Sequence, residues 1–164
     1  SERRNLNMYV ISEDNFGKLI KTNDTVKKNL KTWINHYRML NDTIDIVDPY
    51  IINLGVHFTG KIASGANKFS VLDMAYDKLK DHFSGGYYIG ESFYVSDIYK
   101  VLKEVNGILD VTKVKVINKS GIGYSSATLD INENMSPDGT YLMVPKNAIV
   151  EIKFPQTDIV GKLT

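Results

Sequence analysis

The stretch from Tyr88 to Ile117 constrains the fold most, because it contains a helix, a turn and a strand with both ends of the helix marked. Ser96 stands where a helix N-cap is expected, and Asp97 follows in the first turn, where a negative charge suits the helix dipole. The apolar residues recur at i, i+3, i+4 and i+7, at Ile98, Val101, Leu102 and Val105. This spacing predicts a helix with one buried stripe, which needs a flat partner such as a sheet.

The segment after this helix is a predicted strand. Asn106 and Gly107 end the helix, since glycine readily adopts the left-handed conformation that closes one. Valines then alternate with Lys113 and Lys115, a pattern typical of a strand with one buried face. We therefore expect the helix to lie on a sheet that includes this strand.

The same unit carries a resemblance to a known family. Gly90, the helix start Ser96-Asp97-Ile98, the run Val-Asn-Gly-Ile at 105–108 and the valine-rich strand together resemble the C-terminal part of the baseplate J-like family, from about Tyr9 to Phe154. Its members are wedge proteins in the baseplates of contractile-tailed bacteriophages and related injection machines. The resemblance brings no catalytic residues with it.

That resemblance implies a function in a virion. It implies a structural baseplate wedge subunit that self-associates, as a homodimer or ring, and contacts other baseplate wedge proteins. It further implies that these contacts change when the baseplate triggers sheath contraction and genome delivery. The expected location is the phage tail baseplate, after tail assembly in the host cytoplasm.

Composition limits the classes of partner. The 164 residues are 43% hydrophobic and 24% charged, as in ordinary globular proteins. With 20 Lys+Arg against 19 Asp+Glu, the net charge of +1 creates no large field, so we expect neither nucleic acid nor a membrane as a partner. The absence of cysteine excludes disulfides, thiolate nucleophiles and cysteine metal sites. We find no segment typical of a membrane helix or a signal peptide.

Residues 1–43 are expected to form an N-terminal strand-helix lead-in. A β-prone run at 7–11 precedes a helix predicted from Asn23 to about Leu40, in which we expect Trp33 to be a core residue. The basic residues of this helix lie mostly on its other side. A solvated face is the favoured interpretation over phosphate or membrane binding: Lys27, Lys28, Lys31 and Arg38.

Residues 44–164 are expected to form one α+β domain. Strict alternation over 51–59 marks a strand, and an amphipathic helix follows over about 68–83. The turn signal Ser136-Pro137-Asp138-Gly139 predicts a β-hairpin within a polar insertion, 118–143, with arms at 127–131 and 140–144. A last strand is expected at 148–154 and an extended tail after it. The predicted fold is a mixed or antiparallel sheet with helices on one face, and a ferredoxin-like split β-α-β core.

Residues suited to catalysis or metal binding form no complete motif. His36, His57 and His82 lack metal-site spacing, and His57 is expected on the less buried face of its strand. The segment 130–134 imitates the start of a calcium loop without its later glycine and glutamate. The acidic residues Asp73, Asp77 and Asp81 are read as a solvated helix face. We therefore expect no enzyme, no catalytic residue, no metal, no cofactor and no small-molecule substrate.

The most distinctive local feature is aromatic. Four aromatic residues gather within eight positions, and tyrosine in particular is favoured at protein interfaces: Tyr87, Tyr88, Phe93 and Tyr94. We predict an interface there, with the 118–143 insertion and the tail as further candidates. Two or three of the four residues could instead complete the core. The alternative function is a small-molecule or regulatory binding module of ferredoxin-like fold.

Overall fold

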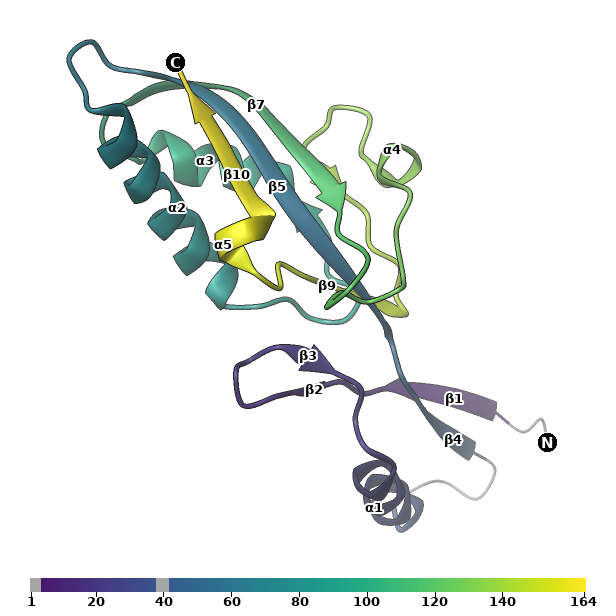
Figure 1. Ribbon diagram of the computed structural model, residues 1–164. Helices are drawn as coiled ribbons and strands as arrows, with labels where there is room; N and C mark the ends of the chain where they lie inside the picture. Colours follow the sequence, from purple (N-terminus) through teal and green to yellow (C-terminus); the bar gives the residue numbers. More distant parts are fainter. Residues whose placement is uncertain (1–3, 38–41) are drawn as a thin grey trace. The chain divides into compact units, whose positions relative to one another are not determined.

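The computed structural model describes residues 4–37 and 42–164, which belong to two compact units, Ser1–Tyr50 and Ile51–Thr164 (Figure 1). The first contains β1 (Arg4–Tyr9), β2 (Ser12–Glu13), β3 (Leu19–Ile20), α1 (Asp24–Asn35) and β4 (Asp42–Val47). The second contains the remaining elements. They are β5 (Tyr50–Ile62), α2 (Lys68–Ser84), β6 (Phe93–Tyr94), α3 (Val95–Lys103), β7 (Ile108–Asn118), α4 (Ile131–Asn134), β8 (Tyr141–Leu142), β9 (Ala148–Glu151), α5 (Pro155–Asp158) and β10 (Ile159–Leu163).

The N-terminal unit is built on a parallel pair of strands, β1 and β4, in register from Arg4 opposite Asp42 to Tyr9 opposite Val47. A short antiparallel ribbon, β2–β3, and helix α1 complete it. The strand pattern that begins near residue 44 therefore belongs to this unit and pairs with β1. The unit ends close to Pro49, which separates β4 from β5 and has no N–H to donate to a strand ladder.

The C-terminal unit is organised around β5, its longest strand. In the main sheet β5 lies between β7, which is antiparallel to it, and β10, which is parallel, while β9 also pairs with β5. One side of β5 is fully buried, as its alternation predicts, at Ile52, Leu54, Val56 and Phe58. The opposite side includes His57, which is exposed as expected.

Helices α2 and α3 lie together on one face of this sheet (Figure 1). The cap of α2 is Asn67, whose side chain accepts hydrogen bonds from the N–H groups of Phe69 and Ser70 at 3.0 and 3.1 Å. The two helices bury Val71, Ala75, Leu79, Phe83, Val95, Ile98 and Leu102 against the strands. The apolar stripes read from the sequence are thus the stripes that form the core.

The start of α3 differs from the prediction. The N-cap position is Tyr94, which makes no side-chain capping bond, and Ser96 lies inside the first turn. The N–H of Ser96 is one of the first-turn donors that lack a partner within the helix, and it donates to the Thr140 carbonyl at 3.0 Å. The helix ends at Lys103, slightly before the predicted end, and Gly107, with φ 99°, lies in the turn that leads into β7.

The predicted hairpin within 118–143 is wrong in its first arm. Residues 127–131 form no strand, and Asp130 caps the helical turn α4 by accepting from the Glu133 N–H at 3.0 Å. The predicted turn at 136–139 does form, and a single bridge joins Met135 to Leu142 across it. β8 pairs mainly with β6, a strand that is far from it in the sequence.

The α+β class and the single helical face are confirmed, whereas the ferredoxin-like outline is wrong. A split β-α-β unit places another strand between its two parallel strands. Here the parallel strands β5 and β10 are direct neighbours, and two successive helices join β5 to its antiparallel neighbour β7.

The C-terminal segment is a part of the core, not an extended tail. Ile159 and Leu163 of β10 are buried, and α5 precedes them. Gly161 permits this strand to approach, because a Cβ at that position would overlap the ring of Phe58. The N–H of Gly161 donates to the Tyr76 hydroxyl of α2 at 3.0 Å, which joins strand and helix directly.

Candidate interaction surfaces

The N-terminal unit exposes most of its large apolar side chains. Among its described residues, 4–37 and 42–50, Ile34 is the one hydrophobic side chain that is buried, at 8% exposed. Large apolar side chains that face solvent are Leu6, Met8, Phe16, Ile20, Val26, Trp33, Tyr37 and Tyr50. A pair of strands with one helix offers too little second layer to cover them. Exposed aromatic side chains in contact, such as Trp33 and Tyr37, are typical of a protein–protein contact surface.

Trp33 was expected in the core, and this expectation is wrong. Its side chain is 61% exposed and packs against Tyr37, 74% exposed, with ring centroids 4.9 Å apart. Ile34 is the single buried residue of α1, so the described part of the unit leaves Trp33 and Tyr37 uncovered. The pair Trp33–Tyr37 therefore forms an exposed aromatic ridge on α1.

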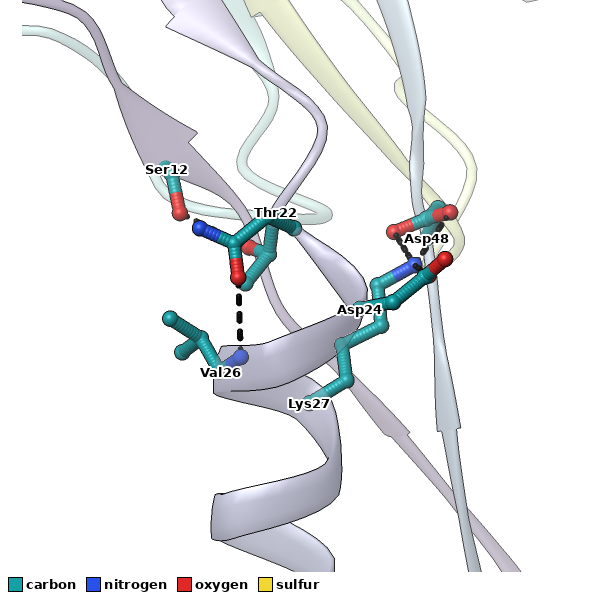
Figure 2. Close-up of polar contacts among 7 residues, drawn as sticks. Ser12, Thr22, Asp24, Val26, Lys27 and Asp48 are labelled. Atoms are coloured by element: carbon teal, nitrogen blue, oxygen red, sulfur yellow. Dashed lines mark hydrogen bonds and ion pairs between the residues drawn. The ribbon is translucent and has the colours of Figure 1, made fainter.

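Polar contacts hold α1 to the strands of its unit. Figure 2 shows Lys27 reaching from α1 to Asp48, just after β4, with a separation of 2.8 Å. Lys31 lies 3.9 Å from Asp45 of β4, and a small hollow lined by Asp24, Lys27, Lys28, Lys31, Asp45 and Ile46 opens beside them. The basic helix side thus faces carboxylates as well as solvent. Arg38, assigned to the same side, lies outside the described residues.

A second contact fixes the entry into α1. The hydroxyls of Ser12 and Thr22 lie 2.8 Å apart, and Thr22 is buried (Figure 2). The Asn23 side chain then accepts from the Val26 N–H at 2.8 Å, the N-cap that the sequence predicts. These bonds orient the helix and so set where the aromatic ridge points within its unit.

The four predicted interface residues divide between core and surface. Phe93 is 1% exposed and packs between Phe83 and Tyr87, with centroid distances of 6.0 and 5.6 Å. Tyr87 is half-buried; burial, then the carboxylates of Glu91 and Asp97, raise its pKa above the usual value of 10.0. These two complete the core, as the alternative interpretation holds.

The other two predicted interface residues are exposed. Tyr88 is 84% exposed, while its backbone N–H donates to the Glu91 carboxylate at 2.7 Å. Tyr94 is 49% exposed and packs against Tyr141 of β8 with centroids 5.8 Å apart. The cluster therefore presents two tyrosines to solvent on a segment held rigid by its buried neighbours.

Sequence reasoning missed a polar cluster around Asp158, a carboxylate that is 1% exposed. The Tyr124 hydroxyl donates to it at 2.5 Å and the Phe154 N–H at 2.9 Å, while the Lys119 ammonium lies 3.9 Å away. These contacts fasten the glycine-rich segment after β7 onto α5. The available sequence signal was apolar Ile159 and Leu163 after Asp158, which place the C-terminal strand in the core.

The residues considered for chemistry are exposed or have structural roles. His36, His57 and His82 are all exposed, and the Asp130 carboxylate caps α4. Within residues 4–37 and 42–164, no group of three or more metal-ligating side chains comes together. No helix of that same part of the chain is long and apolar enough to cross a membrane.

The fold and its surfaces define an α+β protein with two exposed aromatic features, one in each unit. No protein-family model matches the chain, and a search of curated proteins found no significant relative.

Proposed function

We propose that this chain is a non-enzymatic assembly module whose function is to bury surface against other protein subunits. The observation that carries this proposal is the N-terminal unit, which buries one hydrophobic side chain among its described residues and exposes Trp33 and Tyr37. Covering such residues in a contact removes apolar area from water and stabilises the assembly. Tyr88 and Tyr94 supply a second exposed aromatic surface in the C-terminal unit.

The setting we propose is the baseplate of a contractile phage tail. The residues that resemble the baseplate J-like family support it, and the proposed role is that of the C-terminal part of the large wedge ring protein of T-even-type phages. Such a module joins wedges into a ring, contacts other wedge proteins and rearranges these contacts as the sheath contracts. Its work is mechanical, so it requires neither a cofactor nor a substrate.

Sedimentation equilibrium over a wide concentration range tests the assembly function. We expect a dimer or larger species at micromolar protein. The double variant Trp33→Ser, Tyr37→Ser should weaken association by about 30-fold or more, because loss of an aromatic anchor at an interface costs about 2 kcal/mol or more. The matched control is Leu109→Ser, since Leu109 is 69% exposed in the other unit and lies outside the interface candidates there. A strict monomer at high concentration would contradict the proposal.

Electron microscopy tests the setting. An antibody raised against this chain, carrying a gold label, should mark the baseplate end of contractile-tailed particles and leave head and sheath unlabelled. Label on the sheath alone would contradict the proposed role in the baseplate wedge, but it would not contradict the proposed assembly function.

A further inference from the structure

On the face of the main sheet opposite α2 and α3, the part around His57 is exposed, whereas Asn53 and Gly55 on the same side of β5 are buried. Residues directly opposite each other in neighbouring strands point to the same side. The registers therefore form two rows across β10, β5 and β7, one of Val160, His57 and Lys115 and one of Lys162, Thr59 and Lys113. Lys61, opposite Asp110, continues the same face. Every lysine in these rows is exposed.

This surface is strongly basic although the whole chain is almost neutral. We call the residues His57, Lys61, Lys113, Lys115 and Lys162 the basic sheet face. Its four lysines face a single carboxylate, that of Asp110, and none of them forms an ion pair within residues 4–37 and 42–164. Like charges at neighbouring positions of a sheet repel, so an anionic partner would relieve an unfavourable arrangement.

The chain carries a complementary acidic surface on α2. Asp73, Asp77 and Asp81 recur every four residues, on the side opposite the buried stripe of Val71, Ala75, Leu79 and Phe83. We call the three the acidic row; all are exposed, and none forms an ion pair within the described chain. Like charges at i and i+4 destabilise a helix, so this row also gains from a partner of opposite charge. Lys78 and Lys80 lie beside it.

The spacings of the two surfaces match. Carboxylates four residues apart on a helix are separated by about 6.0 Å along its axis. Same-side residues two apart on a strand, such as Lys113 and Lys115, are separated by about 6.7 Å. Lys162 and Lys113 lie two strand spacings apart, about 9.6 Å, close to the width of a helix. A helix lying along β5 would thus have lysines on both sides.

The acidic row cannot reach the basic sheet face of its own chain. Helix α2 packs on the covered face of the same sheet, and its acidic row points away from that sheet. A second copy of the chain carries the complement of each surface.

We propose that the acidic row of α2 in one copy docks onto the basic sheet face of the next copy, in a head-to-tail contact. This inference rests on the proposed function and specifies a surface for its self-association. Because two different patches meet, each copy of a pair keeps one free patch, and the pair as a whole keeps one of each kind. Repetition of the contact closes a ring if its rotation allows and otherwise extends a filament.

A charge-swap experiment in the full chain tests the contact. Variant one, Lys113→Glu with Lys115→Glu, makes the sheet face acidic; variant two, Asp73→Lys with Asp77→Lys, makes the row basic. Each alone should associate at least tenfold more weakly than the wild type in sedimentation equilibrium, because like charges then meet. An equal mixture should recover association, since the altered face of variant one fits the altered row of variant two.

The control is Lys100→Glu with Lys146→Glu, which gives the same change in net charge as variant one at exposed sites away from both surfaces. It should associate as the wild type does. Wild-type association should also weaken as salt rises from about 0.05 to about 0.5 M, since salt screens exposed charges.

The outcomes separate the two proposals. If the wild type associates and both variants associate equally well, the head-to-tail contact is wrong while the assembly function stands. If the wild type is monomeric, both are wrong. If single-stranded DNA binds the wild type and not variant one, and self-association is unchanged in variant one, the basic sheet face serves nucleic acid and the contact is overturned.

Discussion

Single residues decide whether the C-terminal segment joins the core. Gly161 allows β10 to lie beside β5 over the ring of Phe58, and the buried Asp158 carboxylate collects the donors that hold the preceding turn. One position requires the absence of a side chain, and the other requires a charged one. Neither requirement is visible in hydrophobic periodicity, because each depends on a distant residue. Phe58 lies about 100 positions before Gly161, and Tyr124 lies 34 positions before Asp158.

Substitution of Gly161 by alanine should lower the free energy of unfolding by about 1–3 kcal/mol, because the added methyl group must displace the Phe58 ring in a packed core. Urea denaturation measures the change. Gly85→Ala is the matched control, since a Cβ at Gly85 meets nothing within 4 Å and its φ of −69° suits any residue. Equal effects of the two substitutions would contradict the close approach of β10.

Alkaline pH should destabilise the folded chain through two tyrosines. Partial burial, then the hydrogen bond to Asp158, raise the pKa of Tyr124 above 10.0, and burial raises the pKa of Tyr87 further. Above about pH 10 the unfolded chain loses these protons before the folded one does, so stability is complete below that pH and falls as pH rises through the folded pKa values.

Tyr124→Phe separates the contribution of one tyrosine. It should cost about 1–3 kcal/mol at neutral pH, since Asp158 loses a donor, and it should also flatten the decline of stability above about pH 10. Urea denaturation across pH measures both. Tyr88→Phe is the control, because Tyr88 is largely exposed. An unchanged alkaline slope in Tyr124→Phe would show that this hydroxyl does not titrate differently on folding.

At the scale of elements, local sequence signals predicted the helices and strands themselves but not how the strands pair. Periodicity and backbone preference, which act over a few residues, account for the stripes of α2 and α3, the alternation of β5 and β7, the Asn23 cap and the turn at Gly107. The pairings of β8 with β6 and of β10 with β5 depend on distant partners. The polar insertion was predicted to be a hairpin from its turn signal at 136–139. The turn forms, but the first predicted arm does not.

The cap of α2 gives a test at this scale. Asn67→Ala removes the acceptor for the Phe69 and Ser70 N–H groups and should destabilise the chain by about 1 kcal/mol. Asn67→Asp keeps an acceptor and adds a charge that the helix dipole favours, so its stability should equal or exceed that of the wild type. Thermal denaturation distinguishes them; equal losses in both would mean that the cap contributes nothing.

At the scale of the whole molecule, the two units differ in how much they bury. The C-terminal unit has one continuous core on the helical side of its sheet, whereas the N-terminal unit leaves its aromatic ridge in solvent. The sequence predicted an interface at Tyr87, Tyr88, Phe93 and Tyr94, of which Tyr88 and Tyr94 are exposed. It also placed Trp33 inside, although Trp33 is exposed. Amphipathic spacing shows that a side is apolar but not which neighbour, within the chain or outside it, covers that side.

Hydrogen exchange should reveal this difference. Backbone amides of β1 and β4 should exchange at least about 100-fold faster than those of central β5, because local opening of a thin unit exposes them without global unfolding. Mass spectrometry of peptides from each strand makes the measurement. At concentrations where copies associate, exchange in the N-terminal unit should slow, and β5 serves as the internal reference. Equal protection of both units at low concentration would contradict the claim that the N-terminal unit opens locally more readily than the C-terminal unit.

The parallel pairing of β10 with β5 also has a consequence for synthesis. Ile159 lies opposite Val56, so β5 and β10 leave the ribosome about 100 residues apart. At about 5–20 residues per second, translation leaves one edge of β5 without its neighbour for roughly 5–20 s. During that interval the Phe58 ring and the inner side of α2 are open to nascent chains and to chaperones. The segment that completes the core arrives last, so folding of this unit must await the final stage of its translation.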